Sequence, residues 1–504
     1  MQPSRLARHR PCFATVTAVI VALFAAWAVA AEPNSTNQSA DTILLTDSLG
    51  RVVHVLTNDL PVSLRPPGAI DGNHQTPQSA KGARQSPAVR RRTEAGRAGA
   101  DDLAFFPAVP PCLMPYLANL DEFGNTALKP GALFAVGPLE PEVQGAKYWL
   151  SEHGLRYSLE QTITGVGMTD VRQGNNGLGF YELDWQSAWA VFDAPGTGAG
   201  WFSSHFEIKS GLGAAGMDQS AGSNIGSVTE PTGLWSSVNG IRISELAWQQ
   251  SLRDGEVVIV AGMVNQGDYL DGNAYANSGR GQFINSALIN SQVLPLPGYN
   301  FGANLQWQPH KDWYTLLGAS GGNAKAGHAP WTDFSLNTWS VVGELGYAPA
   351  DFGGWGPGVY RVQPFIAQAD GPTQGGIGFN FQQQLGADSP FGWFGRFGVG
   401  GSAVAAGAQA QIGTGLVTHA PLYYAGLLPK RADDLLGVGF VWSQPSATSQ
   451  PVYHENEYIL ETFYAVQLTP LMKLQPDLQI VWNPAFNPDP GPATVFQIQL
   501  IIAW

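Results

Sequence analysis

The stretch that decides the fold is FQIQLIIAW, residues 496–504. Apolar side chains occupy every second position from Phe496 to Trp504, and two of the intervening residues, Gln497 and Gln499, are polar. Successive side chains on a β-strand point to opposite faces of the sheet. This segment therefore predicts a strand with one apolar face and one polar face.

The same period of two recurs through the chain from about residue 154 onward. Segments that show it are residues 155–163, 181–191, 202–209, 301–308, 339–347, 377–385, 436–443 and 460–468. Two all-β architectures fit such strands. In a soluble sandwich, the apolar faces of two sheets pack on each other. In an outer-membrane barrel, the apolar face meets lipid and the polar face lines a lumen.

Large aromatic residues near the ends of the apolar runs favour the barrel, because such residues concentrate at membrane–water interfaces. We expect positions of this kind at Trp201, Trp307, Trp313, Tyr347, Trp442 and Trp504. A strand that ends in an aromatic residue at the C-terminus also fits outer-membrane barrels. The barrel assembly machinery, which receives such strands, is therefore a predicted partner of the strand that ends at Trp504.

The connections between strands differ in length in the way that a barrel requires. Segments 308–312 and 469–470 are short and polar, whereas segments 211–240, 265–299 and 443–455 are long and rich in Gly, Asn and Ser. This asymmetry matches short periplasmic turns and long outer loops, and bacterial barrels have an even strand number. About 350 residues, at about 20 for each strand and its loop, allow about 16 to 18 strands. We predict a transmembrane antiparallel β-barrel of about 16 strands.

Composition supports this fold class. Charged residues make up 13% of the chain, about half of the roughly 25% usual in soluble domains. The net charge of −13 argues against a nucleic-acid partner. Because the chain has only two cysteines, Cys12 and Cys112, we expect neither a disulfide framework nor a cysteine-based metal site.

The N-terminal part has a different texture. Arg5, Arg8 and Arg10 precede the uncharged apolar residues 13–29, and Ala-Val-Ala follows at 28–30. This pattern predicts a secretory signal peptide over residues 1–31, with a membrane anchor helix as the alternative. Residues 32–143 are rich in Pro, Ser and Arg, so we expect a largely disordered extension there. Residues 144–504 then form the barrel domain.

Five stretches carry motifs of a known family: WQQSLRDGEVVIVAGMVNQGDY (248–269), FINSA (283–287), LPGYNFGANLQWQP (296–309), YYAGLLPKRADDLLGVGF (423–440) and ETFYAVQLTPLMKLQPDLQIVWNP (461–484). They resemble the carbohydrate-selective porin family (OprB type) of Gram-negative outer membranes. The resemblance covers about residues 145–504. It implies a porin barrel of 16 strands in the outer membrane and passive diffusion of small sugars such as glucose.

A pore for neutral, hydroxyl-rich solutes needs paired charges and amides that replace hydrogen bonds with water. The polar strand faces supply such groups, and we expect the long loop 265–299 to fold into the lumen and narrow it. The acidic excess predicts a mild preference for cations if ions pass. The predicted pore-lining residues are Arg156, Glu160, Glu182, Asp184, His205, Glu207, Lys209, Asp268, Asp271, Arg280, Glu344, Arg396, Glu461, Lys473 and Asp477.

The sequence has no Walker A and no HExxH motif, and we predict no enzymatic activity, no cofactor and no bound metal. Two alternatives stay open. One is a porin for small polar solutes in general. The other is a secreted soluble β-sandwich that binds or hydrolyses polysaccharide, with its acid pair drawn from Glu182, Asp184 and Glu207. Whether the chain forms a homo-oligomer is also left open.

Overall fold

The structure, a computed structural model, describes most of the chain from residue 153 onward and short pieces before it. It describes residues 42–46, 52–56, 133, 143, 146–147, 149–150 and 153–504, except 195–197, 213–218, 234–239, 323–327, 329–330, 332–334, 336, 370, 388, 403–406, 429, 447–451 and 490. The signal peptide and most of the extension expected to be disordered lie outside these residues. Within the extension, β1 (Thr42–Thr46) and β2 (Val52–Leu56) form a two-stranded sheet that the sequence did not predict.

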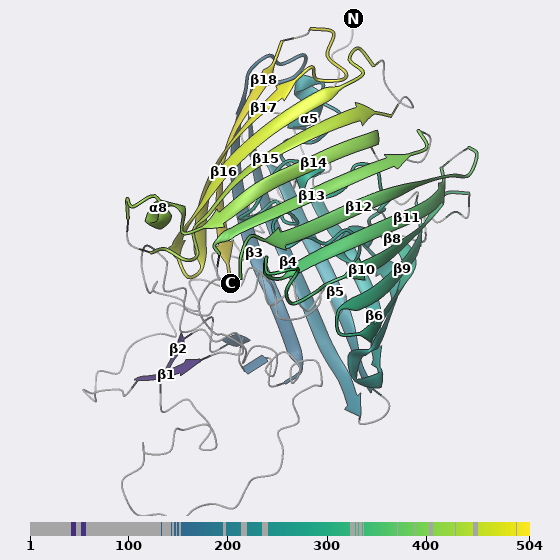
Figure 1. Cartoon of the computed structure of the whole chain (residues 1–504), viewed down its shortest axis with the longest axis vertical. Helices are drawn as coiled ribbons and strands as arrows, with labels where there is room; N and C mark the ends of the chain where they lie inside the picture. The colour runs from purple at the N-terminus through teal and green to yellow at the C-terminus, as the bar shows by residue number, and fades with distance from the viewer. Residues whose placement is uncertain are drawn as a thin grey trace, which may run out of the picture. The chain divides into compact units, whose positions relative to one another are not determined.

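The remaining strands close into one antiparallel barrel of sixteen strands (Figure 1), which confirms the predicted fold class and strand number. Each strand pairs with its neighbours in sequence, and β18 pairs with β3 to complete the ring. The strands are β3 (Leu155–Met168), β4 (Gly177–Ala194), β5 (Gly198–Gly211), β6 (Gly240–Leu252), β7 (Val257–Val264), β8 (Asn300–His310), β9 (Trp313–Gly321), β10 (Trp339–Tyr347), β11 (Gly358–Gln368), β12 (Gln374–Gln384), β13 (Phe391–Gly400), β14 (Ala408–His419), β15 (Leu435–Pro445), β16 (Glu457–Thr469), β17 (Met472–Trp482) and β18 (Ala493–Ala503).

The helical segments whose bounds the structure describes are all short. They are α5 (Ala221–Ile225), η3 (Arg253–Gly255), η4 (Gln266–Asp268), α6 (Ser286–Ile289) and α8 (Pro421–Tyr424). In the part of the chain that the structure describes, no helix has the length and hydrophobicity needed to cross a bilayer.

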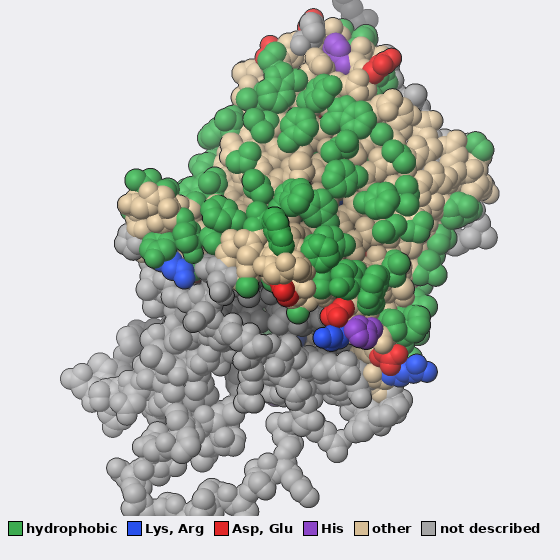
Figure 2. Space-filling view, in the orientation of Figure 1, with side chains coloured by type: hydrophobic (Ala, Val, Ile, Leu, Met, Phe, Trp, Pro, Cys, Tyr) green, Lys and Arg blue, Asp and Glu red, His purple; other side chains and the backbone are tan. Residues whose placement is uncertain are grey.

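The barrel turns its apolar side chains outward. Along β18, Phe496 and Ile498 are 51% and 43% exposed, whereas Gln497 and Gln499 are fully buried. Figure 2 shows hydrophobic side chains spread over the outer face of the strands. The soluble-sandwich alternative is therefore wrong, because the sixteen strands form one closed barrel with an apolar outer face, as in barrels that lie in hydrocarbon.

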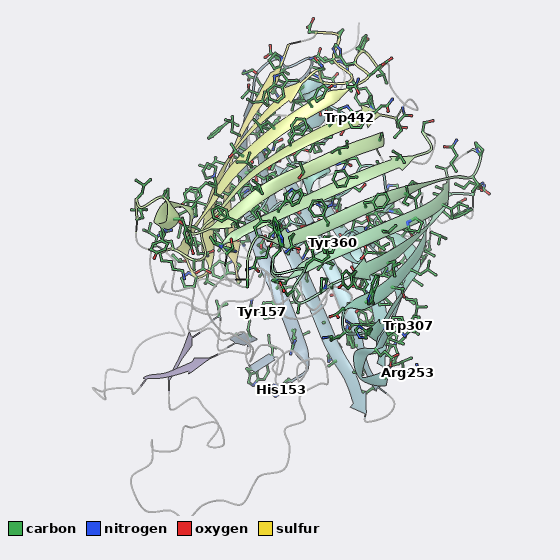
Figure 3. All side chains as sticks on the ribbon, viewed as in Figure 1. His153, Tyr157, Arg253, Trp307, Tyr360 and Trp442 are labelled. Atoms are coloured by element: carbon green, nitrogen blue, oxygen red, sulfur yellow. The ribbon has the colours of Figure 1, made fainter. Side chains whose placement is uncertain are left out.

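Aromatic residues lie at the strand ends of this outer face, with one exception. Trp307 and Trp442 lie toward opposite ends of the barrel (Figure 3), and the ring of Trp313 packs on Tyr347 at 4.6 Å between centroids. The prediction for Trp201 is wrong: this residue is 5% exposed and packs in the interior with Val258 and other buried residues. The reason is strand parity, since odd positions of β5 face inward.

The two ends of the barrel differ as predicted. Because the strands run up and down in sequence order, the short turns 311–312 and 470–471 lie at one end. The long connections 212–239, 265–299 and 446–456 lie at the other. In outer-membrane barrels, the end with short turns faces the periplasm.

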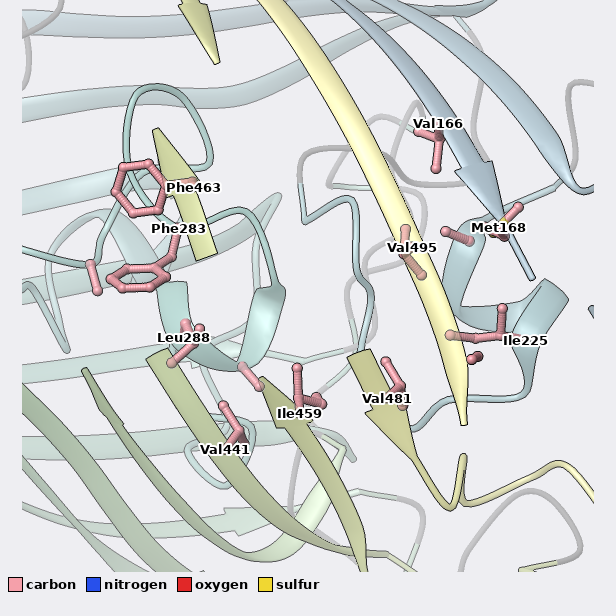
Figure 4. Close-up of a cluster of buried hydrophobic side chains, with 14 of the residues drawn as sticks. Val166, Met168, Ile225, Phe283, Leu288, Val441, Ile459, Phe463, Val481 and Val495 are labelled. Atoms are coloured by element: carbon pink, nitrogen blue, oxygen red, sulfur yellow. The ribbon is translucent and has the colours of Figure 1, made fainter. Parts of the chain in front are cut away.

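Glycines on the inward face make room for the segment 265–299. A Cβ on Gly437 would lie 2.8 Å from the Phe283 ring, and one on Gly392 would lie 2.3 Å from the Tyr275 ring. Figure 4 shows Phe283 and Leu288 packed among inward residues of the strands, Phe463 included. The glycine content of the strands is thus explained in part by the apolar side chains that this segment carries into the barrel.

The outward face gives a first test of the membrane orientation. We expect Ile498→Lys to lower the free energy of unfolding by about 2–4 kcal/mol, because Ile498 lies mid-strand on the face that meets hydrocarbon. Thr494→Lys lies on the same face near the strand end and is expected to cost far less, because the cost of a lysine falls with distance from the bilayer centre. Urea unfolding in lipid vesicles measures both. Equal costs for the two variants would contradict the orientation.

Candidate functional site

The segment 265–299, which we call the interior loop, connects β7 to β8 and lies inside the barrel. It carries η4 and α6, and its apolar residues Leu270, Phe283, Ile284 and Leu288 are almost completely buried. Its polar groups bond to inward side chains of strands around the wall. The interior loop therefore narrows the space that the strands enclose.

Arg280 is the centre of the largest charge cluster. Its guanidinium lies 2.8 Å from Glu160 on β3, and 2.9 Å from both Glu182 and Asp184 on β4. Burial alone would lower the pKa of Arg280, but these three carboxylates hold it well above its ordinary value. The guanidinium therefore stays charged and ties the interior loop to two neighbouring strands.

The cluster continues along β5 and β6. Lys209 lies 2.8 Å from Glu182 and 2.9 Å from Glu207. His205 lies 3.0 Å from Asp184 and 3.8 Å from Asp268 of the interior loop. Alternating charges on adjacent strands give a ladder in which each carboxylate has a basic neighbour.

A second cluster holds the first part of the interior loop to the other side of the wall. The Nε of Arg396 on β13 donates to Asp271 at 3.0 Å, and Asn380 on β12 donates to the same carboxylate at 2.6 Å. Glu344 on β10 accepts from the backbone N–H of Asp271 at 3.1 Å and from Tyr314 at 2.7 Å. Every partner in this cluster is buried.

Polar strand residues also bond to the backbone of the inner segments. Glu461 on β16 accepts the backbone N–H groups of Ile284 and Asn285. Gln479 and Gln497, on β17 and β18, both donate to the carbonyl of Pro231, at 2.9 and 2.8 Å. These contacts satisfy backbone groups that would otherwise be costly to bury.

The predicted residues fall into three groups in the structure. Eleven of them take part in the contacts given above: Glu160, Glu182, Asp184, His205, Glu207, Lys209, Asp268, Asp271, Arg280, Glu344 and Arg396. Glu461 binds the interior loop, and Asp477 accepts from Gln479 at 3.0 Å. Arg156 and Lys473 form the third group, whose members face inward and are only half buried.

Sequence reasoning missed two inward arginines. Arg242 on β6 lies 3.6 Å from Glu207, and Arg361 on β11 lies 3.4 Å from Glu344. The signal was available, because Ile241 and Ile243 flank the first and Tyr360 and Val362 flank the second. Both arginines sit at the polar positions of an alternating strand.

Three of the inward residues also have the composition of a metal site. Ligand atoms of Asp184, His205 and Glu207 lie within 4.8 Å of one another. Protein cations already occupy this position, since Arg280 pairs with Asp184 and Lys209 pairs with Glu207. The geometry therefore favours an ion-pair network over a bound metal.

A closed antiparallel barrel with an apolar outer face and a loop folded inside defines the porin class of outer-membrane proteins. The model of one family, the carbohydrate-selective porins of the OprB family, matches residues 196–376 and 372–503. The chain therefore belongs to the OprB family of carbohydrate-selective porins, a family of channels.

Curated relatives are named porins, and a solved structure has a similar fold. Porin AaxA of Chlamydia felis is 26% identical over 51% of this chain and 56% of its own length. Porin AaxA of Chlamydia caviae is 26% identical over 62% of this chain and 67% of its own length. The chain thus spans little more than half of the first relative. The high-pH structure of Pseudomonas putida OprB, 15% identical, has a TM-score of 0.58 and covers 74% of this chain and 99% of that one, a likeness in fold.

Proposed function

We propose that this protein lets small, glucose-like sugars diffuse passively through the outer membrane, along an interior narrowed by the segment 265–299. The proposal rests on the ion pairs of Arg280 with Glu160, Glu182 and Asp184. These ion pairs fix the interior loop inside the barrel of a carbohydrate-selective porin. The width of the remaining passage is therefore set by groups with fixed positions.

The chemistry of the inner surface supports a neutral, hydroxyl-rich solute. Charged groups occur as opposite pairs, so a sugar meets donors and acceptors without a strong net field. The side chain of Asp268 is 24% exposed beside the Arg280 cluster, which makes it a contact group for a passing solute. Asn277 and Gln282 on the same loop are also partly exposed and add amide groups.

Liposome swelling tests the proposal. Vesicles containing the protein are expected to swell faster in glucose than in tetraethylene glycol, a neutral solute of similar size without the sugar's ring of hydroxyls. Larger oligosaccharides should enter more slowly than glucose. If glucose and tetraethylene glycol entered at equal rates, the protein would be a porin for small polar solutes in general.

Two further predictions concern partners and ions. Recognition of β18 by the barrel assembly machinery is expected from its alternating pattern and its aromatic end at Trp504.

A mild preference for cations follows from the surplus of Glu and Asp over basic residues around Arg280. The reversal potential in a salt gradient across a planar bilayer measures this preference.

A further inference from the structure

The turn between β14 and β15, residues 420–434, presents an apolar tip to the outside. We call this segment the α8 turn, after the short helix Pro421–Tyr424 that it contains. Tyr423, Tyr424, Leu427 and Leu428 are 46%, 45%, 69% and 47% exposed. Four large apolar residues held together at a surface mark an interaction site more often than a solvated turn.

Hydrogen bonds hold the α8 turn in a fixed conformation, a brace that keeps its apolar residues exposed. Arg431 forms two hydrogen bonds to the Asp434 carboxylate, at 2.7 and 2.9 Å, and Tyr464 donates to the same carboxylate at 2.7 Å. The backbone N–H of Leu427 donates to the carbonyl of Leu422 at 2.8 Å, which closes the tip. A braced turn cannot bury its tip by collapsing onto the barrel.

The brace also shows on which side of the wall the turn lies. Tyr464 is an outward residue of β16, because its neighbours Phe463 and Ala465 face the interior. The ring of Tyr424 lies 6.4 Å from that of Phe391, another outward residue, at the start of β13. The tip is therefore continuous with the apolar outer face of the barrel. Figure 1 shows α8 at the edge of the barrel wall, and Figure 2 shows hydrophobic side chains running from this projection onto the wall.

A basic residue adjoins the tip. Lys430, two positions after Leu428, is exposed. A lysine beside tyrosines and leucines is the usual composition of a segment at a membrane interface, where the ammonium meets phosphates and the aromatic and aliphatic groups enter the acyl boundary. The α8 turn lies at the end with the short turns 311–312 and 470–471, which faces the periplasm in barrels of this kind.

We propose that the α8 turn is a membrane anchor that inserts Tyr423, Tyr424, Leu427 and Leu428 into the periplasmic leaflet and binds an anionic phospholipid headgroup through Lys430. The continuity of the tip with the lipid-facing wall favours a lipid over a soluble protein, and the positive charge favours an anionic headgroup. The inference is independent of which solute the barrel passes.

A depth-sensitive label tests the insertion. In the full chain with Cys12→Ser and Cys112→Ser, Leu427→Cys carries a bimane label, and the protein is placed in vesicles of phosphatidylcholine and phosphatidylglycerol. Nitroxide-labelled lipid is expected to quench the label strongly, and its emission should be shifted to the blue. Lys311→Cys is the matched control, because Lys311 is exposed in a turn at the same end but has no apolar neighbours in its turn. Its label should stay accessible to a water-soluble quencher.

A second measurement tests the headgroup. Quenching at position 427 by labelled phosphatidylglycerol, relative to labelled phosphatidylcholine, reports the preference for anionic lipid. Lys430→Gln is expected to lower this preference about five-fold, the effect of one basic group near an anionic leaflet. High salt should lower it in the parent protein, because salt screens the attraction. A preference unaffected by both changes would overturn the role of Lys430.

Two results would overturn the insertion itself. Equal exposure to water of the labels at positions 427 and 311 would show that the tip faces the aqueous phase, as a binding surface for a soluble protein would. Shielding at position 427 that depends on the protein-to-lipid ratio, without lipid quenching, would assign the tip to contact between copies of the chain. Heat-modified mobility on gels verifies in each case that the labelled barrel is folded.

Discussion

Arg280→Ala is expected to raise the single-channel conductance and to let larger sugars enter vesicles. The substitution removes the ion pairs to Glu160, Glu182 and Asp184 that hold the interior loop against β3 and β4, so the loop is freer to move away from these strands. Removing one partner of a buried charge cluster costs about 3–5 kcal/mol. Conductance in planar bilayers and swelling in trisaccharide measure the opening, and urea unfolding measures the stability.

Two companion variants make this result specific. Arg280→Lys keeps the charge but loses the planar fork that reaches three carboxylates, so its conductance should lie between those of the parent and the alanine variant. Arg253→Ala removes an exposed arginine that lies 3.7 Å from Glu256, and it should leave the conductance unchanged. A folded Arg280→Ala protein with the parent conductance would show that other contacts suffice to hold the loop.

Asp271→Asn is expected to destabilise the barrel by about 3–5 kcal/mol, because it leaves the Arg396 guanidinium buried without its counter-charge. Asp271 has a φ of +62°, a conformation that Asn adopts readily, so the backbone at this position is not strained by the change. Asp170→Asn is the matched control: Asp170 also has a positive φ, +50°, but its side chain is exposed. The midpoint of urea unfolding in vesicles compares the two.

A double-mutant cycle separates the ion pair from general disruption. Arg396→Met should lower the free energy of unfolding much less in the Asp271→Asn protein than in the parent. In the double variant, the Asp271 carboxylate that would be left unpaired is already absent. Equal costs in both backgrounds, or an unfolding midpoint of Asp271→Asn equal to that of the parent, would contradict the assigned pairing.

The alternation of the strands made the wall predictable, because a period of two fixes which side chains face inward once one strand is assigned. The same rule, applied to β5, would have moved Trp201 from the lipid interface to the interior, and applied to β6 and β11 it would have found Arg242 and Arg361. The alternation therefore contained the information needed to place Trp201, Arg242 and Arg361 on the inward face.

The contact partners of the inward residues could not be predicted from the sequence. Nothing in the local pattern around Arg280 says that its guanidinium meets Glu160, Glu182 and Asp184, which lie about a hundred residues earlier in the chain. Such contacts depend on how the interior loop is threaded through a closed ring. The room left by Gly392 and Gly437 for Tyr275 and Phe283 is equally invisible until the register is known.

The pairing of β3 with β18 connects the closure of the barrel to the packing of its interior. These strands come first and last in the barrel, so their ladder is the one that makes the ring continuous. Inner contacts reach both of them, since Arg280 pairs with Glu160 on β3 and Gln497 on β18 donates to Pro231. The inner segments thus link the two strands whose pairing closes the ring. Closure of the ring and the filling of its interior therefore stabilise each other.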